Sequence, residues 1–344
     1  MKKIKVAVIG CGAITEFRHA PEYKANEHVE IIAFCDPLIK RAEKLAGLYG
    51  GKVYSDYMEV LNEDINAVSV CTSNITHAMI TLEASKKGMH VLCEKPMATT
   101  LIEADNMIRT SQEYGKILMI GFDQRFEAVH IKSKEILDSG EMGKILAFKS
   151  SYGHGGPEFW SADKGTHTWF FKKNSAHMGA MGDLGVHKVD LIRWLISDEI
   201  DEVSSIMGTL DKKYESGEFI DVEDNAICHF KTRTGIIGSI SASWTNYGEE
   251  DYDTVLYCEK GVLKIFNDPV YPITIQKKNG DKIFVKIKNT LNNSGVIDSF
   301  INSCINGSKP VVTGEDGYES LSVVLACMES SEKKSHVKVN HLLL

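Results

Sequence analysis

The chain has 344 residues, which is more than one hydrophobic core usually supports, so two domains are expected. Its hydrophobic share of 43% and charged share of 25% are those of an ordinary soluble globular protein. The 39 basic and 47 acidic residues give a net charge of −8, which argues against nucleic acid or an anionic membrane surface as a partner.

The eight cysteines are scattered along the chain without a CxxC pair. Four of them fall within or just after apolar strand-like runs, where a thiol behaves as a small buried hydrophobe. The chain passes from Met1 almost directly into an apolar strand with no signal peptide, and its apolar runs are too short to span a bilayer. These features predict a reduced, cytoplasmic protein.

The first predicted strand, Ile4–Ile9, runs into Gly10-Cys11-Gly12-Ala13-Ile14-Thr15. A G-x-G-x-x pattern between a strand and a helix is typical of a dinucleotide-binding turn. Gly10 would permit the tight turn and Gly12 the approach of a pyrophosphate, which the helix amino terminus attracts. Thr15 is β-branched at the place where glycine or alanine is usual, so this pattern alone is weak evidence.

The second predicted strand, Val29–Cys35, ends in Asp36-Pro37. An acidic residue at this place accepts hydrogen bonds from the adenosine ribose hydroxyls, and its charge repels a 2′-phosphate. The nearest arginine is Arg41 on the following helix, so NAD is favoured over NADP. Two alternatives stay open: Asp36 caps a helix that begins at Pro37, and Arg41 is a solvated residue instead of lying over the adenine.

Strands and helices continue to alternate up to residue 122. The chain runs through a strand at Ala67–Cys71, Thr72-Ser73-Asn74, a helix opening near Thr76-His77, a strand at Met89–Cys93, Glu94-Lys95-Pro96, a helix over 99–114 and a strand over 117–120. This alternation predicts βαβ units and a parallel sheet, whose right-handed crossovers bring the glycine turn, Asp36, Asn74 and Lys95 to one edge. Lys95 alone would be a surface lysine on a proline-stopped loop; its place on this edge puts it beside a cofactor.

After residue 122 the pattern changes to a helix over 127–138 and then to a β-rich region with a helical interruption. The strand candidates are Ile145–Tyr152, Val203–Gly208, Ala226–Lys231, Gly235–Trp244, Thr254–Cys258 and Val262–Phe266. Several alternate apolar and polar residues, as in an antiparallel sheet with one solvated face. We therefore predict an α/β Rossmann dinucleotide-binding domain over 1–122. An α+β substrate-binding and oligomerisation domain with a large, mainly antiparallel open sheet would occupy 123–344, and its bare sheet face predicts a homodimer or homotetramer.

Asp183 and His187 stand four residues apart at the start of an amphipathic helix. On a helix they share one face, where a carboxylate can orient or stabilise a histidine that titrates near neutral pH. The alternative is an aspartate cap beside a core histidine. A zinc site that adds His167 and His177 has ten-residue spacings, which do not fit a compact zinc motif, so no metal is expected.

These motifs together resemble the Gfo/Idh/MocA family of NAD(P)-dependent sugar and polyol oxidoreductases, which includes inositol dehydrogenases. The resemblance rests on Gly-Cys-Gly-Ala-Ile, Asp36, Glu94-Lys95-Pro96, Gly121…Arg125-Phe126, Gly182-Asp183-Leu184-Gly185-Val186-His187-x-x-Asp190 and the segment 310–317, and it covers nearly the whole chain. The chain departs from the family pattern at Thr15, at Ser73, where proline is common, and at Asp123, where asparagine is common.

The resemblance implies hydride transfer between NAD and a secondary hydroxyl of a sugar, sugar derivative or cyclitol. In the catalytic group, His187 would remove the hydroxyl proton, Lys95 would stabilise the alkoxide, and Asp183 would orient the histidine or bind a neighbouring hydroxyl. The expected cofactor-binding residues are Gly10, Cys11, Gly12, Ala13, Ile14, Asp36, Pro37, Arg41, Thr72, Ser73, Asn74, His77, Glu94, Lys95 and Arg125. The substrate wall is expected to combine the catalytic group with His154, Trp160, His167 and Trp169, since sugar sites pair aromatic faces with polar groups.

Two other functions are also compatible with this sequence. Some relatives hold NAD tightly and use transient oxidation to cleave a glycosidic bond without net redox change, and the glycine-rich loop around His154 fits such a hydrolase. A non-catalytic dinucleotide-binding sensor is the other, against which the set of Lys95, Asp183 and His187 argues.

Overall fold

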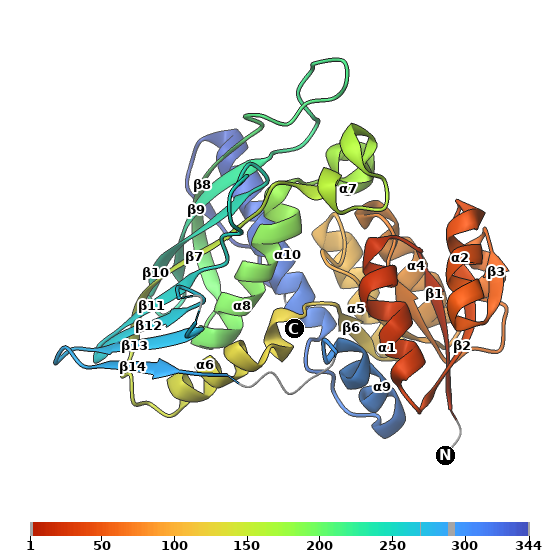
Figure 1. Ribbon diagram of the computed structural model, residues 1–344, viewed down its shortest axis with the longest axis horizontal. Coiled ribbons are helices and arrows are strands. Elements are labelled where there is room, and N and C mark those ends of the chain that lie inside the picture. Colours follow the sequence, from red (N-terminus) through yellow and green to blue (C-terminus); the bar gives the residue numbers. More distant parts are fainter. Residues whose placement is uncertain (1–2, 269, 288–292, 343–344) are drawn as a thin grey trace.

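The computed structural model describes residues 3–268, 270–287 and 293–342, and two β-sheets lie side by side with helices between them (Figure 1). The first sheet contains β1 (Ile4–Ile9), β2 (Val29–Cys35), β3 (Lys52–Tyr54), β4 (Ala67–Val70), β5 (His90–Cys93) and β6 (Leu118–Ile120). These strands are parallel and follow the order β3-β2-β1-β4-β5-β6. This is the strand order of a Rossmann fold, so the predicted fold of the first half is confirmed.

The strands of this sheet are apolar because helices cover both of its faces. The helices are α1 (Ala20–Ala25), α2 (Ile39–Tyr49), α3 (Tyr57–Val60), α4 (Asn74–Lys86) and α5 (Leu101–Glu113). A π-helical turn, Thr15–His19, precedes α1. Helix α5 begins at a capping box in which Thr100 and Glu103 exchange hydrogen bonds with each other's backbone N–H.

The start of α2 corrects one alternative for Asp36. The helix begins at Ile39, with Leu38 before it, so Asp36 is not its cap and Pro37 is not its first residue. Asp36 instead accepts hydrogen bonds from the N–H groups of Cys11 and Leu38, at 2.9 and 2.8 Å. Its carboxylate therefore connects the glycine turn to the end of β2.

The second sheet has nine strands in the order β14-β13-β12-β11-β7-β10-β9-β8-β15. They are β7 (Ile145–Gly153), β8 (Ile200–Gly208), β9 (Asn225–Thr232), β10 (Ile237–Ser243), β11 (Thr254–Cys258), β12 (Gly261–Ile265), β13 (Ile273–Lys277), β14 (Lys282–Val285) and β15 (Val337–Lys338). Apart from the parallel pair of β7 and β10, the strand pairs recorded in this sheet are antiparallel. The prediction of a large, mainly antiparallel sheet is confirmed.

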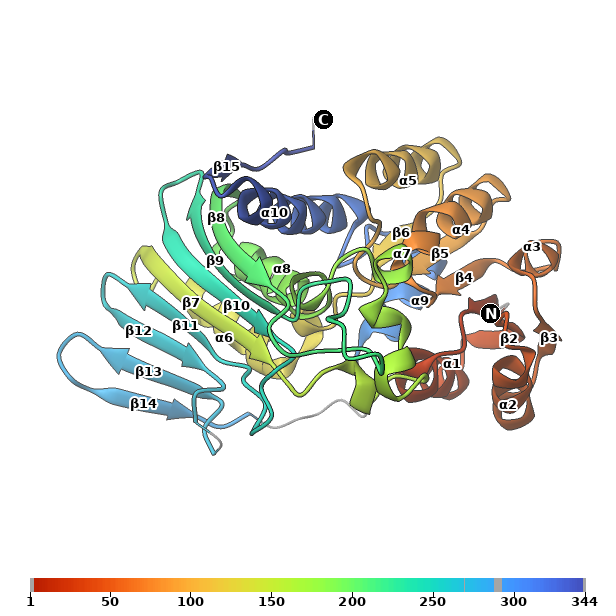
Figure 2. The same cartoon turned by 90° about the horizontal axis from the view of Figure 1, so that it is seen from above.

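Helices cover one face of this second sheet, the face that looks toward the Rossmann sheet (Figure 2). They are α6 (Ala128–Asp138), α8 (Val186–Ile196) and α10 (Gly314–Lys333), while the short α7 (Lys173–Ala176) lies between the two sheets. The alternation along β9 shows the two environments: Ala226, Cys228 and Phe230 are buried, and Ile227 between them is exposed.

The chain returns to the Rossmann sheet near its end. Helix α9 (Val296–Asn306) contacts α1 and β1, and its residues Val296, Ile297, Phe300 and Ile301 are fully buried in one cluster with Val6 and Val8 of β1. The sequence prediction lacked this helix. The division of the chain at residues 122 and 123 stays a prediction.

Candidate active site

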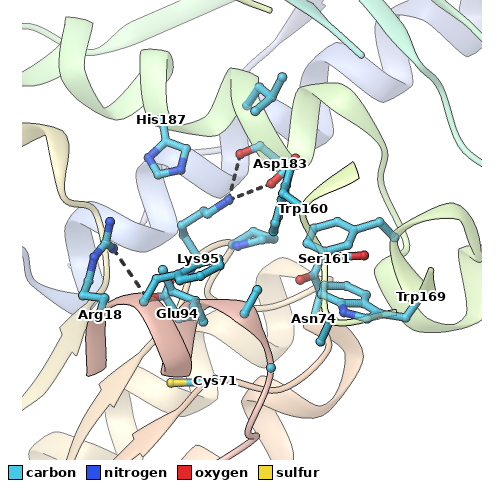
Figure 3. Close-up of a pocket in the computed structure, with 18 of the residues that line it drawn as sticks. Arg18, Cys71, Asn74, Glu94, Lys95, Trp160, Ser161, Trp169, Asp183 and His187 are labelled. Carbon is cyan, nitrogen blue, oxygen red and sulfur yellow. Dashed lines mark hydrogen bonds and ion pairs between the residues drawn. The ribbon is translucent and has the colours of Figure 1, made fainter. Parts of the chain in front are cut away.

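A cavity of about 420 Å³ lies between the two halves, at the carboxyl edge of the parallel sheet. Figure 3 shows side chains of both halves converging on it. The predicted site residues that line it are Gly12, Ala13, Ile14, Arg41, Thr72, Asn74, Glu94, Lys95, His154, Trp160, Trp169, Asp183 and His187. Lys95 and Asp183, which are 88 positions apart in the sequence, therefore meet in one place. Within the Rossmann half, Gly12, Asn74 and Lys95 lie together at the carboxyl edge of the sheet.

The glycine turn has the space that a dinucleotide needs. Gly10 has φ +95°, and a Cβ there would lie 2.4 Å from the carbonyl oxygen of Cys71, so only glycine fits. A Cβ on Gly12 would meet nothing within 4 Å, because Gly12 faces the open cavity. Thr15 is buried and its hydroxyl donates to the carbonyl oxygen of Gly10 at 2.6 Å, which explains the larger residue there.

The amino group of Lys95 is fixed by Asp183. Lys95 Nζ donates to the carbonyl oxygen and to Oδ1 of Asp183, both at 2.9 Å (Figure 3). The other carboxylate oxygen, Oδ2, accepts from Nε1 of the fully buried Trp244 at 3.1 Å. Burial opposes the charge of Asp183, but Lys95 outweighs it and the pKa of Asp183 lies below its ordinary value.

His187 lies at the start of α8 and contacts a different carboxylate from the expected one. Both oxygens of Asp183 are engaged by Lys95 and Trp244, whereas His187 Nδ1 lies 3.3 Å from Oδ1 of Asp123. Asp183 belongs to a π-helical turn, Met181–Gly185, that precedes α8, so the regular α-helical spacing on which the expectation rested is absent there. In this structure, Asp183 binds Lys95, and Asp123 is the carboxylate next to His187.

A buried charge network lies beneath Lys95. Glu94 Oε1 accepts from His19 Nε2 at 2.9 Å and lies 3.9 Å from Arg18, which also contacts Asp123 at 2.5 Å. Burial opposes ionisation of Glu94, but the hydrogen bond from His19 and the charges of Arg18 and Lys95 outweigh it and lower its pKa to about 2. Glu94 is therefore ionised at neutral pH.

The low pKa of Glu94 predicts a loss of stability in acid. The pKa falls from an ordinary 4.5 to about 2, so the ionised carboxylate contributes about 3 kcal/mol of folding free energy above pH 4.5, which is lost as the pH falls toward 2. Urea unfolding across this window should show a smaller decline in Glu94→Gln than in the wild type. The control Glu135→Gln removes an exposed carboxylate paired with Lys132 and should keep the wild-type decline. Equal declines in Glu94→Gln and the wild type would contradict the assignment.

Aromatic rings form the wall of the cavity beyond His187. The wall is a chain of neighbouring rings whose centroids lie 3.9–6.2 Å apart. In order from the ring nearest His187, they belong to Tyr152, His154, Trp160, Phe170 and Trp169. The segment that carries the last three is tied to the Rossmann half at two points. Arg41 pairs with Asp163, and Asn74 donates to the carbonyl oxygen of Ala176 at 2.8 Å.

Several predicted site residues lie outside the cavity lining. His167 is exposed, with its ring 3.3 Å from Glu215. Arg125 is buried and binds Asp190 and Asp316 instead. Gly10 and Cys11 begin the glycine turn but are outside the cavity lining, as are Pro37 and Asp36, which accepts from the N–H of Cys11. Ser73 precedes α4, and His77 is buried beneath the cavity, where its ring contacts the carbonyl oxygens of Pro96 and Thr72. The Lys95–Pro96 bond beside it is cis.

Sequence reasoning did not assign site roles to Arg18, Asp123, Tyr152 and Glu250, all of which line the cavity. Arg18 looks like any helix surface arginine until the fold places it beside Asp123. The sequence did mark Asp123 as a departure from the family pattern, and it places Tyr152 next to the glycine-rich loop around His154. Glu250 lies on a loop without periodicity and gave no signal.

The Rossmann sheet, the open glycine turn and the lysine beside it define a nicotinamide-dependent oxidoreductase. Two family models match this chain: "Oxidoreductase family, NAD-binding Rossmann fold" over residues 4–122 and "GFO/IDH/MocA C-terminal domain" over 130–264. The chain belongs to the Gfo/Idh/MocA family and is an enzyme of the dehydrogenase class.

Named relatives match over almost their whole lengths. Myo-inositol 2-dehydrogenase of Thermotoga maritima is 27% identical, covering 99% of this chain and 100% of the relative. Scyllo-inositol 2-dehydrogenase (NAD⁺) of Bacillus subtilis is 27% identical over 95% and 94%, and D-glucoside 3-dehydrogenase of Escherichia coli is 26% identical over 98% and 97%. A levoglucosan dehydrogenase bound to NADH and levoglucosan has a TM-score of 0.88 at 21% identity over 99% and 100%, which shows the shared fold.

Two features are absent from the described part of the chain. It contains no helix long and apolar enough to cross a membrane. Nor does it contain a group of three or more His, Cys, Asp or Glu side chains suited to hold a metal ion.

Proposed function

We propose that this enzyme oxidises a secondary hydroxyl of a sugar, sugar derivative or cyclitol, with NAD as the hydride acceptor. The observation that carries the proposal is the pairing of Lys95 with Asp183, at the place where the cavity passes from the dinucleotide turn to His187. The relatives named for inositol and glucoside substrates support this substrate class.

The residues present fit NAD. The open space at Gly12, the backbone of Ala13 and Ile14, and the polar side chains of Thr72 and Asn74 would hold its phosphates and its nicotinamide half. NAD, when bound, supplies the carbon that accepts the hydride. The protein binds and orients the alcohol, and one of its side chains removes the hydroxyl proton.

The roles proposed for the three catalytic residues follow from their contacts. Lys95 is held by Asp183 with its ammonium in the cavity, so it can donate to the substrate oxygen and stabilise the charge that develops there. His187, at the start of α8, lines the same cavity and accepts the hydroxyl proton as general base. Asp183 positions Lys95, and its ionised form keeps that ammonium in one place.

The wall of the cavity suits a polyol. Trp160 and Trp169 offer flat faces to the C–H surface of a ring, and His154 offers polar atoms to its hydroxyls. His154 Nδ1 accepts from the N–H of Gly156 at 2.9 Å, which leaves Nε2 available for a substrate hydroxyl. His167, in its exposed position, remains a weaker candidate for this wall.

The test is an assay with NAD and a panel of cyclitols, free sugars and glycosides. We expect NADH to accumulate with at least one cyclitol or sugar, and the oxidised product to be a ketone. Cleavage of a glycoside without NADH would instead support the hydrolase alternative, in which oxidation is transient. Binding of NAD with no conversion of any compound in the panel would contradict both.

We propose NAD over NADP because Asp36 places a carboxylate at the end of β2, and because Arg41 is paired with Asp163. Replacing Asp36 with serine should raise kcat/KM for NADP by about tenfold, since removal of about 1.4 kcal/mol of charge repulsion has this effect. Steady-state kinetics with both cofactors measures the change. The control Asp56→Asn caps the short α3 elsewhere and should leave the cofactor ratio unchanged. A wild-type enzyme that already prefers NADP would contradict the proposal.

We also propose a homodimer or homotetramer through the uncovered face of the second sheet. Ile206, Ile227, Ile237 and Tyr257 are exposed there, and Ile206 pairs with Ile227 across β8 and β9. Apolar side chains gathered on one sheet face are typical of protein interfaces. Light scattering of the purified protein measures the assembly, and a monomer at micromolar concentration would contradict this part.

A cytoplasmic location remains a proposal, which the eight free cysteines support.

A further inference from the structure

Two buried polar atoms face each other beside the cavity. His187 Nδ1 and Asp123 Oδ1 lie 3.3 Å apart, and neither makes a well-aligned hydrogen bond with any described residue. Unpaired polar atoms in a protein interior are unfavourable, so groups of this kind are usually satisfied. A proton on Nδ1 makes this contact attractive, because the N–H of His187 then faces the carboxylate of Asp123.

We propose that Asp123 is the positioning residue for His187: it holds the histidine as the tautomer protonated on Nδ1, leaves Nε2 free for the substrate hydroxyl, and stabilises the imidazolium that forms. The proposal rests on the proposed function, in which His187 is the general base. It replaces Asp183 in that positioning role, since Asp183 is already bound to Lys95 and Trp244.

Arg18 keeps Asp123 ionised for this task. Burial opposes the charge of Asp123, but Arg18 at 2.5 Å and the contact with His187 outweigh it, and its pKa lies well below its ordinary value. A carboxylate that stays ionised beside an imidazole favours the protonated ring without taking the proton itself. Arg18 follows the glycine turn by a few residues, so the segment that binds the cofactor also fixes the carboxylate behind the base.

Other charged and titratable groups surround this pair, and any test has to separate them from Asp123. Lys95 comes from the end of β5, Asp183 from the π-helical turn, Tyr152 from β7, and Glu127 from the start of α6. Of these, Lys95 and Asp183 neutralise each other through their own ion pair. Asp123 is thus the carboxylate that lies next to His187 Nδ1.

NMR of protein with isotope-labelled histidine measures the tautomer and the titration of the His187 ring. This experiment does not require a known substrate. The His187 signal is identified by its loss in His187→Gln. We expect the Nδ1-protonated tautomer in the wild type. Asp123→Asn should move the titration midpoint of this signal to lower pH, and Arg18→Gln should move it to higher pH, because one removes a negative and the other a positive charge.

Kinetics supply a second readout once a substrate is known. Asp123→Asn should lower kcat about tenfold, as part of the 10²–10⁴-fold that a general base supplies, with the KM for NAD unchanged. Its acid limb in the pH–rate profile should move to lower pH. The control Asp105→Asn removes a carboxylate paired with Arg109 on α5, outside the cavity lining, and should leave both readouts unchanged.

Three outcomes would overturn the proposal: an Nε2-protonated tautomer in the wild type, the same titration midpoint in Asp123→Asn, or shifts of the same sign in Asp123→Asn and Arg18→Gln. If instead no compound in the panel is oxidised while the NMR results are as expected, the proposed function fails but the pairing of Asp123 with His187 stands. The two failures are therefore distinguishable.

Discussion

Replacing Lys95 with alanine should reduce kcat by about 10³-fold, while the Kd for NAD changes little. Lys95 is a donor that the structure fixes between the dinucleotide turn and His187, and loss of a donor to a developing oxyanion costs about 10²–10³-fold. The variant also leaves Asp183 buried with an uncompensated charge, which adds to the loss. NADH formation measures kcat, and calorimetric titration measures the Kd for NAD.

The matched control for this variant is Lys149→Ala, which removes an exposed lysine from β7 without touching the cavity. Its kcat should equal that of the wild type. Full activity in Lys95→Ala would contradict the catalytic assignment. A loss of NAD binding as large as the loss of kcat would show that Lys95 serves the cofactor instead.

Replacing Arg125 with alanine should lower the free energy of unfolding by about 3–5 kcal/mol, which is the typical result of breaking a buried ion pair. Arg125 Nε and Nη2 donate to both carboxylate oxygens of Asp190 at 2.8 and 2.6 Å, and both side chains are almost fully buried. In addition, Arg125 Nη2 donates to Asp316, at the start of α10. Its removal therefore leaves the buried carboxylate of Asp190 on α8 with the longer contacts to Ser320 Oγ at 3.4 Å and Arg193 Nη1 at 3.9 Å. Chemical denaturation measures the change.

The control, Arg109→Ala, breaks an exposed pair with Asp105 and should cost about 0–1 kcal/mol. Binding of NAD to folded Arg125→Ala separates two interpretations of this residue. The family resemblance implied a cofactor contact, whereas the contacts with Asp190 and Asp316 indicate a structural role. A variant with wild-type stability and weakened NAD binding would restore the cofactor assignment.

Much of the fold was predictable from local patterns. The strand at Val29–Cys35 was placed at its exact bounds because a β-branched, apolar run ends sharply at an acidic residue and a proline. The strand at Lys52–Tyr54 was not predicted, since three residues with an exposed lysine show no periodicity. Helix α9 was missed for another reason: its apolar residues are buried against the Rossmann sheet, a contact that the local sequence does not reveal.

The candidate site was predictable where one residue type needs one local geometry. Gly10, with its positive φ, and Lys95, beside the proline, are examples. Partnerships between side chains were not predictable. Four-residue spacing suggested that Asp183 pairs with His187, but the π-helical turn and the position of Lys95 assign Asp183 to the lysine. Arg18 and Asp123 are 105 residues apart, and only the folded chain brings them together.

The return of α9 to the Rossmann sheet has a consequence for biosynthesis. When a ribosome has completed residue 122, one face of the nascent cofactor-binding sheet still lacks the buried residues Val296, Ile297, Phe300 and Ile301. The apolar surface that these residues cover stays open to solvent until residues 296–306 have emerged, so the packing of this face is completed late in synthesis. An exchange of cofactor domains between relatives must therefore carry residues 296–306 together with residues 1–122.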